Sequence, residues 1–389
     1  MILLLELQCK DWEHNRVNSE LIFQLKSAFP SEEMKLYAEE KHVKKLADML
    51  DSHNIEIDSE VIEWIDYHGN NADKAKEYEK VIRTIIESNT DVKKVIFLSS
   101  NKGTLLAVSG LASQYTDIIF CNVLHAALEA VCSEGLKKPL RTRIFELLWS
   151  IKHMKKYPQP EKQISMKDCL EKCDSDNIGF WVYTPCYQEE LKGKVADSVI
   201  SRTRFLHLPF YESEEKNLSI DENIIKVGIY GQAVNDNAQA IVERYNEAYD
   251  NGMVIFKVMS KNNKEILQQK NVQSIFDKDY VTNEELEEAI SNLDFILIPY
   301  DRNQYKVTAS GIFFDAISRG VPAITLDSPY FHFYDKYDVV MLAESIDAAS
   351  KMISELHEHK DLYTRYANSE RKLVKKALHE NITTIKEAL

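Results

Sequence analysis

The chain alternates short apolar runs with longer amphipathic stretches from one end to the other. Short apolar runs predict buried strands, whereas apolar residues spaced three or four apart predict helices that pack on one side. In the first half, the predicted strands are Ile2–Gln8, Lys35–Ala38, Ile55–Ile57 or Ile62–Ile65, Lys94–Leu98, Asp117–Cys121, Gly179–Tyr183 and Arg204–Leu208. The predicted helices between them are Ser19–Ala28, Glu40–His53, Ala72–Ser88 and Lys102–Ser113. This alternation is typical of a parallel sheet with crossover helices.

A second series of the same kind begins near residue 225. Its predicted strands are Lys226–Tyr230, Val254–Val258, Val272–Phe276, Phe295–Pro299 and Pro322–Thr325. Its predicted helices are Ala238–Asn251, Asn283–Leu293 and Gly311–Ser318. The acidic residues 213–223 between the two series lack apolar periodicity and are predicted to be a linker.

Two α/β domains are therefore expected, since 389 residues exceed what one hydrophobic core usually holds. We predict Rossmann-like domains at 1–212 and 224–365, with parallel sheets that face each other across a cleft. A C-terminal helix at 366–389 is expected to pack back toward the N-terminal domain. Because ligands of such sheets bind outside the carboxyl ends of the strands, functional residues should directly follow strands.

Composition and charge argue against several classes of function. Hydrophobic residues make up 44% and charged residues 28%, which is typical of a folded globular protein. The net charge of −14 argues against a nucleic-acid partner, because phosphate backbones attract basic surfaces. No apolar run approaches the ~18–20 residues of a membrane span, and the apolar start is too short for a signal peptide. A cytoplasmic protein is expected, with its six cysteines reduced and without a metal site, since Cys169 and Cys173 form only one close pair.

Residues 136–162 depart from this acidic balance, with eight Lys or Arg against two Glu. Apolar residues within this segment recur at helical spacing, and the basic residues gather at both ends. A basic amphipathic helix of this kind predicts peripheral contact with an anionic membrane surface. An ordinary packed helix with solvated lysines is the alternative.

The most informative stretch runs from Asp294 to Ile324. A buried strand ends at Pro299, a loop follows, and Ser310 and Gly311 begin a short helix. The Ser310 hydroxyl and the free N–H groups of a helix start can hold a diphosphate, with glycine allowing close approach. Asp315, one turn later, can accept hydrogen bonds from ribose hydroxyls. Cations that can balance the diphosphate charge are Lys257, Arg302 and Lys306.

This stretch resembles the C-terminal domain of GT-B-fold glycosyltransferases, in particular family-four-like enzymes of bacterial polysaccharide or capsule synthesis. The similarity rests on Pro299, on Ser310-Gly311 followed by three apolar residues, on Asp315-Ala316, and on Gly320-Val-Pro-Ala-Ile324. It implies a nucleotide-sugar donor in the C-terminal domain, held without a metal or other cofactor, and an acceptor in the N-terminal domain. The segment 272–286 is similar to the family's nucleobase segment, which implies donor-binding roles for Phe276 and Tyr280. Val307 stands where the family usually has a Glu, and Asp315 replaces another Glu, so a retaining or inverting reaction is left open.

In the N-terminal half, the loop after the first strand carries the candidate catalytic residues. An imidazole beside a carboxylate is suited to take a hydroxyl proton near neutral pH, which predicts His14 as general base with Glu13 or Asp11 orienting it. The alternative is that His14 caps a helix or lies on the surface. Asn15 and His125 are candidates for acceptor binding or an accessory role, and His125 is otherwise a core histidine. His207, before the linker, resembles a hinge-side motif of these enzymes.

The function predicted from the sequence is transfer of a sugar from a nucleotide-sugar to a glycan or lipid-linked glycan acceptor. Two alternatives share the donor site. One is a nucleotide-sugar epimerase or hydrolase of the same fold, and the other is a non-catalytic nucleotide-sugar-binding subunit.

Overall fold

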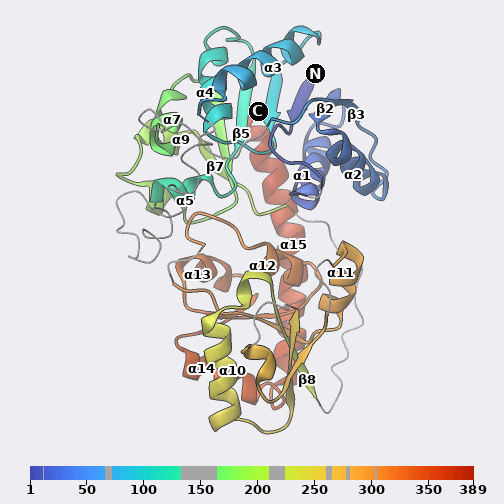
Figure 1. Ribbon diagram of the computed structural model, residues 1–389, viewed down its shortest axis with the longest axis vertical. Helices are drawn as coiled ribbons and strands as arrows, with labels where there is room; N and C mark the ends of the chain where they lie inside the picture. Colours follow the sequence, from blue (N-terminus) through green and yellow to red (C-terminus); the bar gives the residue numbers. More distant parts are fainter. Residues whose placement is uncertain are drawn as a thin grey trace, which may run out of the picture. The chain divides into compact units, whose positions relative to one another are not determined.

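The computed structural model describes residues 1–11, 13–65, 72–132, 164–209, 224–259, 265–276, 281–302 and 305–389 (Figure 1). The chain forms two compact units. The first consists of Met1–Tyr183, Tyr187–Leu206 and Thr383–Leu389, and the second of Thr184–Cys186 and His207–Ile382. The linker predicted at 213–223 and the basic helix predicted within 136–162 lie outside the described residues.

The first unit contains a seven-stranded parallel sheet in the order β3-β2-β1-β4-β5-β6-β7. The strands are β1 (Ile2–Leu5), β2 (Met34–Ala38), β3 (Asp58–Val61), β4 (Lys94–Phe97), β5 (Ile119–Val123), β6 (Ile178–Val182) and β7 (Thr203–Phe205). The helices are α1 (Asn15–Ala28), α2 (Glu40–Asp51), α3 (Ala75–Glu87), α4 (Lys102–Ala112), α5 (Ala127–Cys132), α7 (Met166–Lys172), α8 (Tyr187–Leu191) and α9 (Asp197–Ser201). All four residues of β1 are buried, because a central parallel strand is covered on both faces.

The position of the third strand differs from the sequence prediction. It spans Asp58–Val61, between the two apolar segments proposed for it, and all four of its residues are exposed. Among the described strands, β3 pairs with β2 alone and forms the edge of the sheet. Lys35 of β2 holds it through ion pairs with Glu60 at 2.9 Å and Asp58 at 3.8 Å. A charged edge strand discourages pairing with other chains, and it carries no apolar pattern for a prediction to detect.

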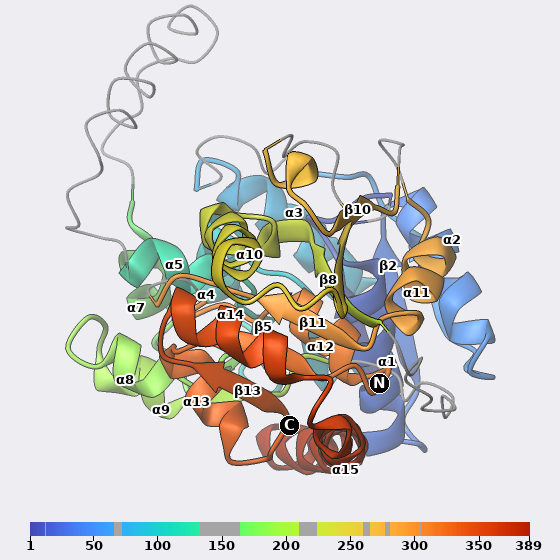
Figure 2. The same ribbon diagram turned by 90° about the horizontal axis from the view of Figure 1, so that it is seen from below.

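The second unit contains a six-stranded parallel sheet in the order β10-β9-β8-β11-β12-β13. Its strands are β8 (Ile225–Tyr230), β9 (Val254–Met259), β10 (Val272–Ser274), β11 (Phe295–Ile298), β12 (Ala323–Leu326) and β13 (Val340–Ala343). Its helices are α10 (Asp236–Ala248), α11 (Asn283–Ser291), α12 (Gly311–Ile317), α13 (Pro329–Asp335), α14 (Ile346–Glu355) and the long α15 (Lys360–Ala388), with single 3-10 turns η1 (Gly231–Ala233) and η2 (Ile266–Gln268). Figure 2 shows α10 lying beside α14, against which it packs. The prediction of two Rossmann-like domains built on parallel sheets is confirmed.

The strand orders locate where ligands bind in sheets of this type. Crossovers diverge on either side of the neighbouring pair β1 and β4 in the first sheet, and of β8 and β11 in the second. A crevice opens at the carboxyl ends of the strands where the connections diverge. The loops that follow these strands are therefore the places to look for functional residues.

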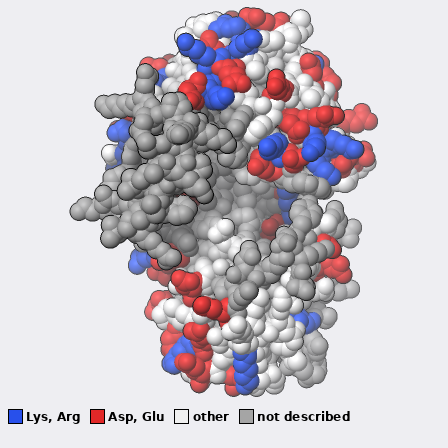
Figure 3. Space-filling model, viewed as in Figure 1, with Lys and Arg blue, Asp and Glu red and all other residues white. Residues whose placement is uncertain are grey.

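Acidic and basic side chains are interspersed over the described residues on the face shown in Figure 3. None of the helices in the described ranges is both long enough and apolar enough to span a bilayer.

Glu370 of α15 is a buried acid in the second unit. Its residue is 0% exposed, and neither carboxylate oxygen has a hydrogen-bond partner among the described residues. Desolvation by burial raises the pKa of Glu370 well above its ordinary value. A group whose pKa is raised on folding stabilises the protein fully below its unfolded pKa, and that contribution is lost as pH rises toward the folded pKa.

Replacing Glu370 by Gln should therefore stabilise the protein at neutral and alkaline pH, because the amide needs no proton on folding. We expect the melting temperature to rise by at least about 2 °C, the shift that ~1 kcal/mol causes in a domain of this size. The gain should shrink as the pH is lowered toward about 5, where the wild-type carboxyl takes up its proton at little cost. Thermal unfolding at alkaline pH and at about pH 5 measures this gain in melting temperature. Glu358→Gln is the control, because the Glu358 side chain is 63% exposed. Equal melting temperatures of wild type and Glu370→Gln at alkaline pH would contradict the assignment.

Candidate functional site

Glu6 turns the chain at the carboxyl end of β1 and is buried there, with 1% of its surface exposed. Its Oε1 accepts the N–H groups of Gln8 (2.9 Å) and Cys9 (3.0 Å). Its Oε2 accepts hydrogen bonds from Asn18 Nδ2 of α1 (2.9 Å) and from Ser99 Oγ after β4 (2.8 Å). One carboxylate thus joins β1, α1 and the loop after β4 at the switch point of the first sheet.

The loop between β1 and α1 is also held from the start of α2. The buried His42 donates from Nδ1 to the carbonyl of Asp11 (3.3 Å) and accepts from Asn18 Nδ2 at Nε2 (3.2 Å). The Asp11 carboxylate forms an ion pair with Lys41 at 3.1 Å. Asp11, which the sequence suggested as a partner for His14, thus contacts α2 through its carbonyl and its carboxylate.

His14 is the residue before α1, which begins four residues earlier than predicted. Its backbone is left-handed (φ 50°), as is that of Asp11 (φ 51°), and its side chain makes no capping hydrogen bond. Left-handed backbone in residues other than glycine is strained and occurs preferentially at functional sites. His14 thus occupies the N-cap position of α1 without capping the helix through its side chain, and the residue is exposed.

Three aromatic side chains, each from a different loop, contact one another in series at the carboxyl end of the first sheet. The rings of His14 and His125 have centroids 4.3 Å apart, and His125 meets Tyr183 edge-on at 5.2 Å. His125 follows β5 and donates from Nε2 to the carbonyl of Leu98 (2.9 Å), while Tyr183 follows β6. The structure thus brings together the two histidines that the sequence singled out separately.

The charges around His14 favour a neutral imidazole with a nearby negative charge. The His14 residue is exposed, yet neighbouring protein atoms still desolvate the ring, and this desolvation lowers the His14 pKa below its ordinary value. The carboxylates of Glu6 and Glu13 oppose that lowering of the His14 pKa, and His42 adds to it. Burial and the neighbouring His14 lower the pKa of His125 to about 3, so His125 stays neutral. His14 can accordingly accept a proton, and Glu6 and Glu13 stabilise the imidazolium that forms.

In the second unit, the loop after β8 lies against the start of α12. Tyr230 donates its hydroxyl to the carbonyl of Ile312 (3.0 Å). Gly231 has φ +55°, and a Cβ there would stand 3.0 Å from Ile312 Cδ1. Both observations favour glycine at this position, where the loop after β8 approaches the start of α12.

Ser310 organises the start of α12. Its N–H donates to the Tyr330 hydroxyl (3.2 Å), and its Oγ accepts the Phe313 N–H (3.2 Å) and shares a hydrogen bond with Tyr300 (3.0 Å). Ser310 is fully buried, so its polar groups serve the protein itself. At Gly311, by contrast, an added Cβ would meet nothing within 4 Å. A ligand at this helix start would therefore contact the backbone of Gly311 and Ile312, whose N–H groups precede the helical hydrogen bonds.

Asp315 lies on α12 with 23% of its side chain exposed. Arg319 Nη1 donates to the Asp315 carbonyl at 2.8 Å and lies 3.9 Å from its carboxylate. Arg319 also forms an ion pair with Glu287 of α11 at 2.8 Å. The Asp315 carboxylate thus lies one turn into the helix beside a fixed positive charge, and its role beside a ribose stays a prediction.

The other residues predicted to bind the nucleotide-sugar donor lie on several different elements. Lys257 lies within β9 and hydrogen-bonds to Gln273 of β10, on the side of β9 away from β8. Arg302 is exposed after β11, and Lys306 is half-buried, with its carbonyl accepting from Thr184 (2.9 Å). Phe276 is half-buried after β10, and Tyr280 lies outside the described residues.

His207 and the cysteines have structural roles. His207 is buried and hydrogen-bonds from Nε2 to Glu380 of α15 (3.0 Å), and its backbone pairs with the Asn381 amide. Cys169 and Cys173 are buried free thiols. Within the part of the chain that the structure describes, no group of three or more His, Cys, Asp or Glu is placed to hold a metal ion.

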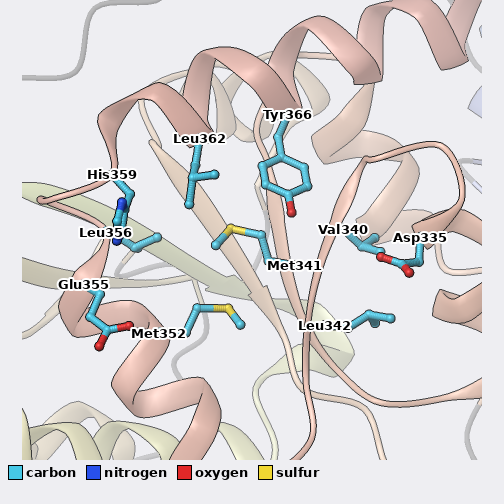
Figure 4. Close-up of a pocket in the computed structure, with 10 residues that line it drawn as sticks. All are labelled: Asp335, Val340, Met341, Leu342, Met352, Glu355, Leu356, His359, Leu362 and Tyr366. Carbon is cyan, nitrogen blue, oxygen red and sulfur yellow. The ribbon is translucent and has the colours of Figure 1, made fainter.

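A pocket of about 390 Å³ in the second unit lies among β13, α14 and α15 (Figure 4). Leu362 and Tyr366 project into it from α15, and Met352 and Glu355 from the end of α14. Helices that follow parallel strands end at the edge of the sheet opposite the carboxyl ends of the strands. This pocket is therefore not at the switch point.

Sequence reasoning missed three residues of these loops. Glu6 was hidden inside the first apolar run, although a charge at the end of a buried strand was a usable signal. Tyr183 was read as the last residue of a strand, and Gly231 gave no signal without the shape of α12. Only the folded chain brings these positions next to His14 and Ser310.

The two Rossmann-like units give the chain the GT-B fold. No protein-family model matches the chain, and no curated protein sequence is significantly similar to it. Several solved structures share its fold over nearly the whole length. HepE of Anabaena, solved with UDP and glucose, has a TM-score of 0.58 at 12% identity, covering 99% of this chain and 97% of its own.

Two further structures with this fold differ in activity. Sucrose-phosphate synthase of Thermosynechococcus elongatus has a TM-score of 0.63 at 10% identity, over 99% of this chain and 96% of its own. UDP-GlcNAc 2-epimerase of Neisseria meningitidis, bound to UDP-GlcNAc, has a TM-score of 0.55 at 14% identity, over 98% and 100%. At these identities the similarity establishes the fold, and the activity has to be argued from the residues of this chain.

The open space at Gly311 gives a direct test of the nucleotide site. Gly311→Ala should leave the melting temperature nearly unchanged, because the added methyl group meets no protein atom. It should weaken binding of nucleoside diphosphates at least about tenfold, or about 1.4 kcal/mol, by blocking close approach to the helix start. Calorimetric titration with UDP, GDP, ADP and dTDP measures the affinity.

The matched control is Gly110→Ala in α4, where an added Cβ also meets nothing. It should retain full affinity. Asp315→Ala should weaken binding as well, by the loss of charge-assisted hydrogen bonds worth ~1.5–3 kcal/mol each. Wild-type affinity of both Gly311→Ala and Asp315→Ala for every nucleotide would exclude this helix start as the donor site.

Proposed function

We propose that the protein is a glycosyltransferase that moves a sugar from a nucleotide-sugar to a hydroxyl group of a glycan acceptor, with His14 as general base. The observation that carries the proposal is the position of the His14 ring, 4.3 Å from that of His125 at the carboxyl end of the first sheet, where the field of the buried Glu6 carboxylate raises the His14 pKa against desolvation. Hydroxyl attack on a sugar requires a neutral base that can become a cation, and the surroundings of His14 favour this change.

The second unit supplies what the leaving group needs. A nucleoside diphosphate departs with developing negative charge, which N–H groups at a helix start stabilise without a metal ion. Gly311 and Ile312 offer such groups, and Asp315 is the acceptor for ribose hydroxyls. HepE was solved with UDP and the 2-epimerase with UDP-GlcNAc, which makes UDP-sugars the first donors to test.

The reaction follows from these roles. His14 accepts the proton of the acceptor hydroxyl as its oxygen bonds to the anomeric carbon of the donor. The bond between that carbon and the diphosphate oxygen breaks, and the diphosphate leaves with the electron pair. With a protein base and no covalent intermediate, the product has inverted anomeric configuration.

Further parts of the proposal rest on the sequence. A lipid-linked glycan acceptor, metal independence, and a cytoplasmic location with membrane contact through residues 136–162 remain predictions. Epimerisation or hydrolysis of the nucleotide-sugar is the competing activity, since an enzyme with that activity shares the fold.

The test is incubation with a panel of nucleotide-sugars, with and without glycan acceptors, in the presence of a chelator, followed by mass spectrometry of the products. We expect acceptor-dependent transfer that survives chelation. His14→Ala should lower turnover by ~10²–10⁴-fold while donor binding remains. Because desolvation lowers the pKa of His14 and only the neutral ring is a base, kcat/KM should fall at acid pH with an apparent pKa below about 6.5.

Three results would contradict the proposal. Product formed from the donor without any acceptor indicates an epimerase or a hydrolase. A product with retained anomeric configuration, or near-normal turnover of His14→Ala, excludes His14 as the base of an inverting transfer.

A further inference from the structure

Among the buried polar atoms of the first unit that have no hydrogen-bond partner within the described residues, four belong to amide or hydroxyl side chains of the region around His14. They are Gln8 Nε2, Asn15 Nδ2, Asn18 Oδ1 and the Tyr183 hydroxyl. Asn15 is 6% exposed, Asn18 0% and Tyr183 2%. An unpaired buried polar group costs ~1–3 kcal/mol, so four of them in one region require an explanation.

The four atoms belong to side chains around one corner of the sheet. Asn15 directly follows His14, whose ring is linked through that of His125 to the ring of Tyr183. Asn18 binds the Glu6 carboxylate through its other amide atom, and the backbone of Gln8 binds the same carboxylate. Glu6 and Glu20 also contribute to raising the pKa of Tyr183, which indicates that its hydroxyl lies within their field.

The unpaired groups form a mixed set. Two amide NH₂ groups donate, the Asn18 carbonyl accepts, and the tyrosine hydroxyl can do either. A ligand that satisfies such a set carries groups that both donate and accept, as hydroxyl groups do.

The local charge opposes an anionic ligand. Glu6, Glu13 and Glu20 lie on this loop and helix, and the nearby cations already have partners. Arg16 is paired with Glu20 (3.1 Å), Lys41 with Asp11 (3.1 Å), and Lys10 lies over the Trp64 ring (3.9 Å). A phosphate or carboxylate would meet negative charge here, whereas a neutral group would not.

We infer that Asn15, Asn18, Tyr183 and Gln8 form a subsite for a neutral, hydroxyl-rich sugar ring, the part of the acceptor that carries the reacting hydroxyl. This deepens the proposed function and rests on it, since His14 beside the subsite is the proposed base. Asn15 and Tyr183 position the ring, and the acidic surroundings discriminate against phosphorylated sugars and uronates.

The experiment measures direct binding of saccharides to the full chain by saturation-transfer NMR. The probes are methyl glycosides of glucose, galactose, mannose and N-acetylglucosamine, each beside its 6-phosphate and, for the hexoses, the matching uronate. We expect at least one neutral glycoside to bind more tightly than its charged counterparts. Tyr183→Phe and Asn15→Ala should each weaken that binding about 3- to 10-fold, the loss of one neutral hydrogen bond.

Tyr187→Phe is the matched control, because the Tyr187 hydroxyl is already bonded to the Thr203 carbonyl (3.0 Å). It should keep wild-type glycoside affinity even if it lowers stability. Wild-type glycoside affinity in both Tyr183→Phe and Asn15→Ala would overturn the inference and leave these atoms to buried water. Equal or tighter binding of the charged sugars, or no binding by any member of the panel, would overturn it too.

The two claims fail in different ways. Glycoside binding that depends on Tyr183 and Asn15, in a protein that transfers no sugar, refutes the proposed function and leaves the subsite intact. Acceptor-dependent transfer that needs His14 but is indifferent to Tyr183 and Asn15 refutes the subsite alone.

Discussion

The buried carboxylate of Glu6 is the constraint on which the first unit's site depends. Moving a charge out of water is costly unless hydrogen bonds replace the lost hydration. Four donors do so here, from the backbone of Gln8 and Cys9 and the side chains of Asn18 and Ser99. These bonds fix the loop after β1 against α1 and the loop after β4. The same carboxylate acts on the imidazole of His14, so the fold and the chemistry rest on one group.

A comparable arrangement in the second unit uses a glycine and neutral groups. Gly231 permits the approach of β8 to α12, while Tyr230 and Ser310 supply the hydrogen bonds that hold the helix start. An anionic leaving group needs dipoles rather than a carboxylate, and the exposed N–H groups of a helix start meet this need. Each unit thus has at its switch point the polarity that its proposed part of the reaction requires.

The sequence predicted the regular parts of this architecture because buried parallel strands are continuous apolar runs. β1, β4 and β11 are buried on both faces, and their positions could be read directly. β3 could not, because an exposed edge strand carries no such pattern. In the site, His14 and His125 were found as residues that follow strands. The ion pair of Asp11 with Lys41 could not be predicted, because proximity along the chain says nothing of α2, and Glu6 was overlooked because its four donors lie as far away as residue 99.

The most direct measurement of the central claim is an NMR titration of the His14 ring in the wild type and in Glu6→Gln, with His14→Gln to assign the signal. We expect a wild-type His14 pKa below about 6.5, because desolvation outweighs the nearby carboxylates. We expect a lower His14 pKa still in Glu6→Gln, because that variant keeps the burial and loses the negative charge that favours the imidazolium. A His14 pKa that is unchanged or raised in Glu6→Gln would contradict the claim that Glu6 stabilises the protonated base.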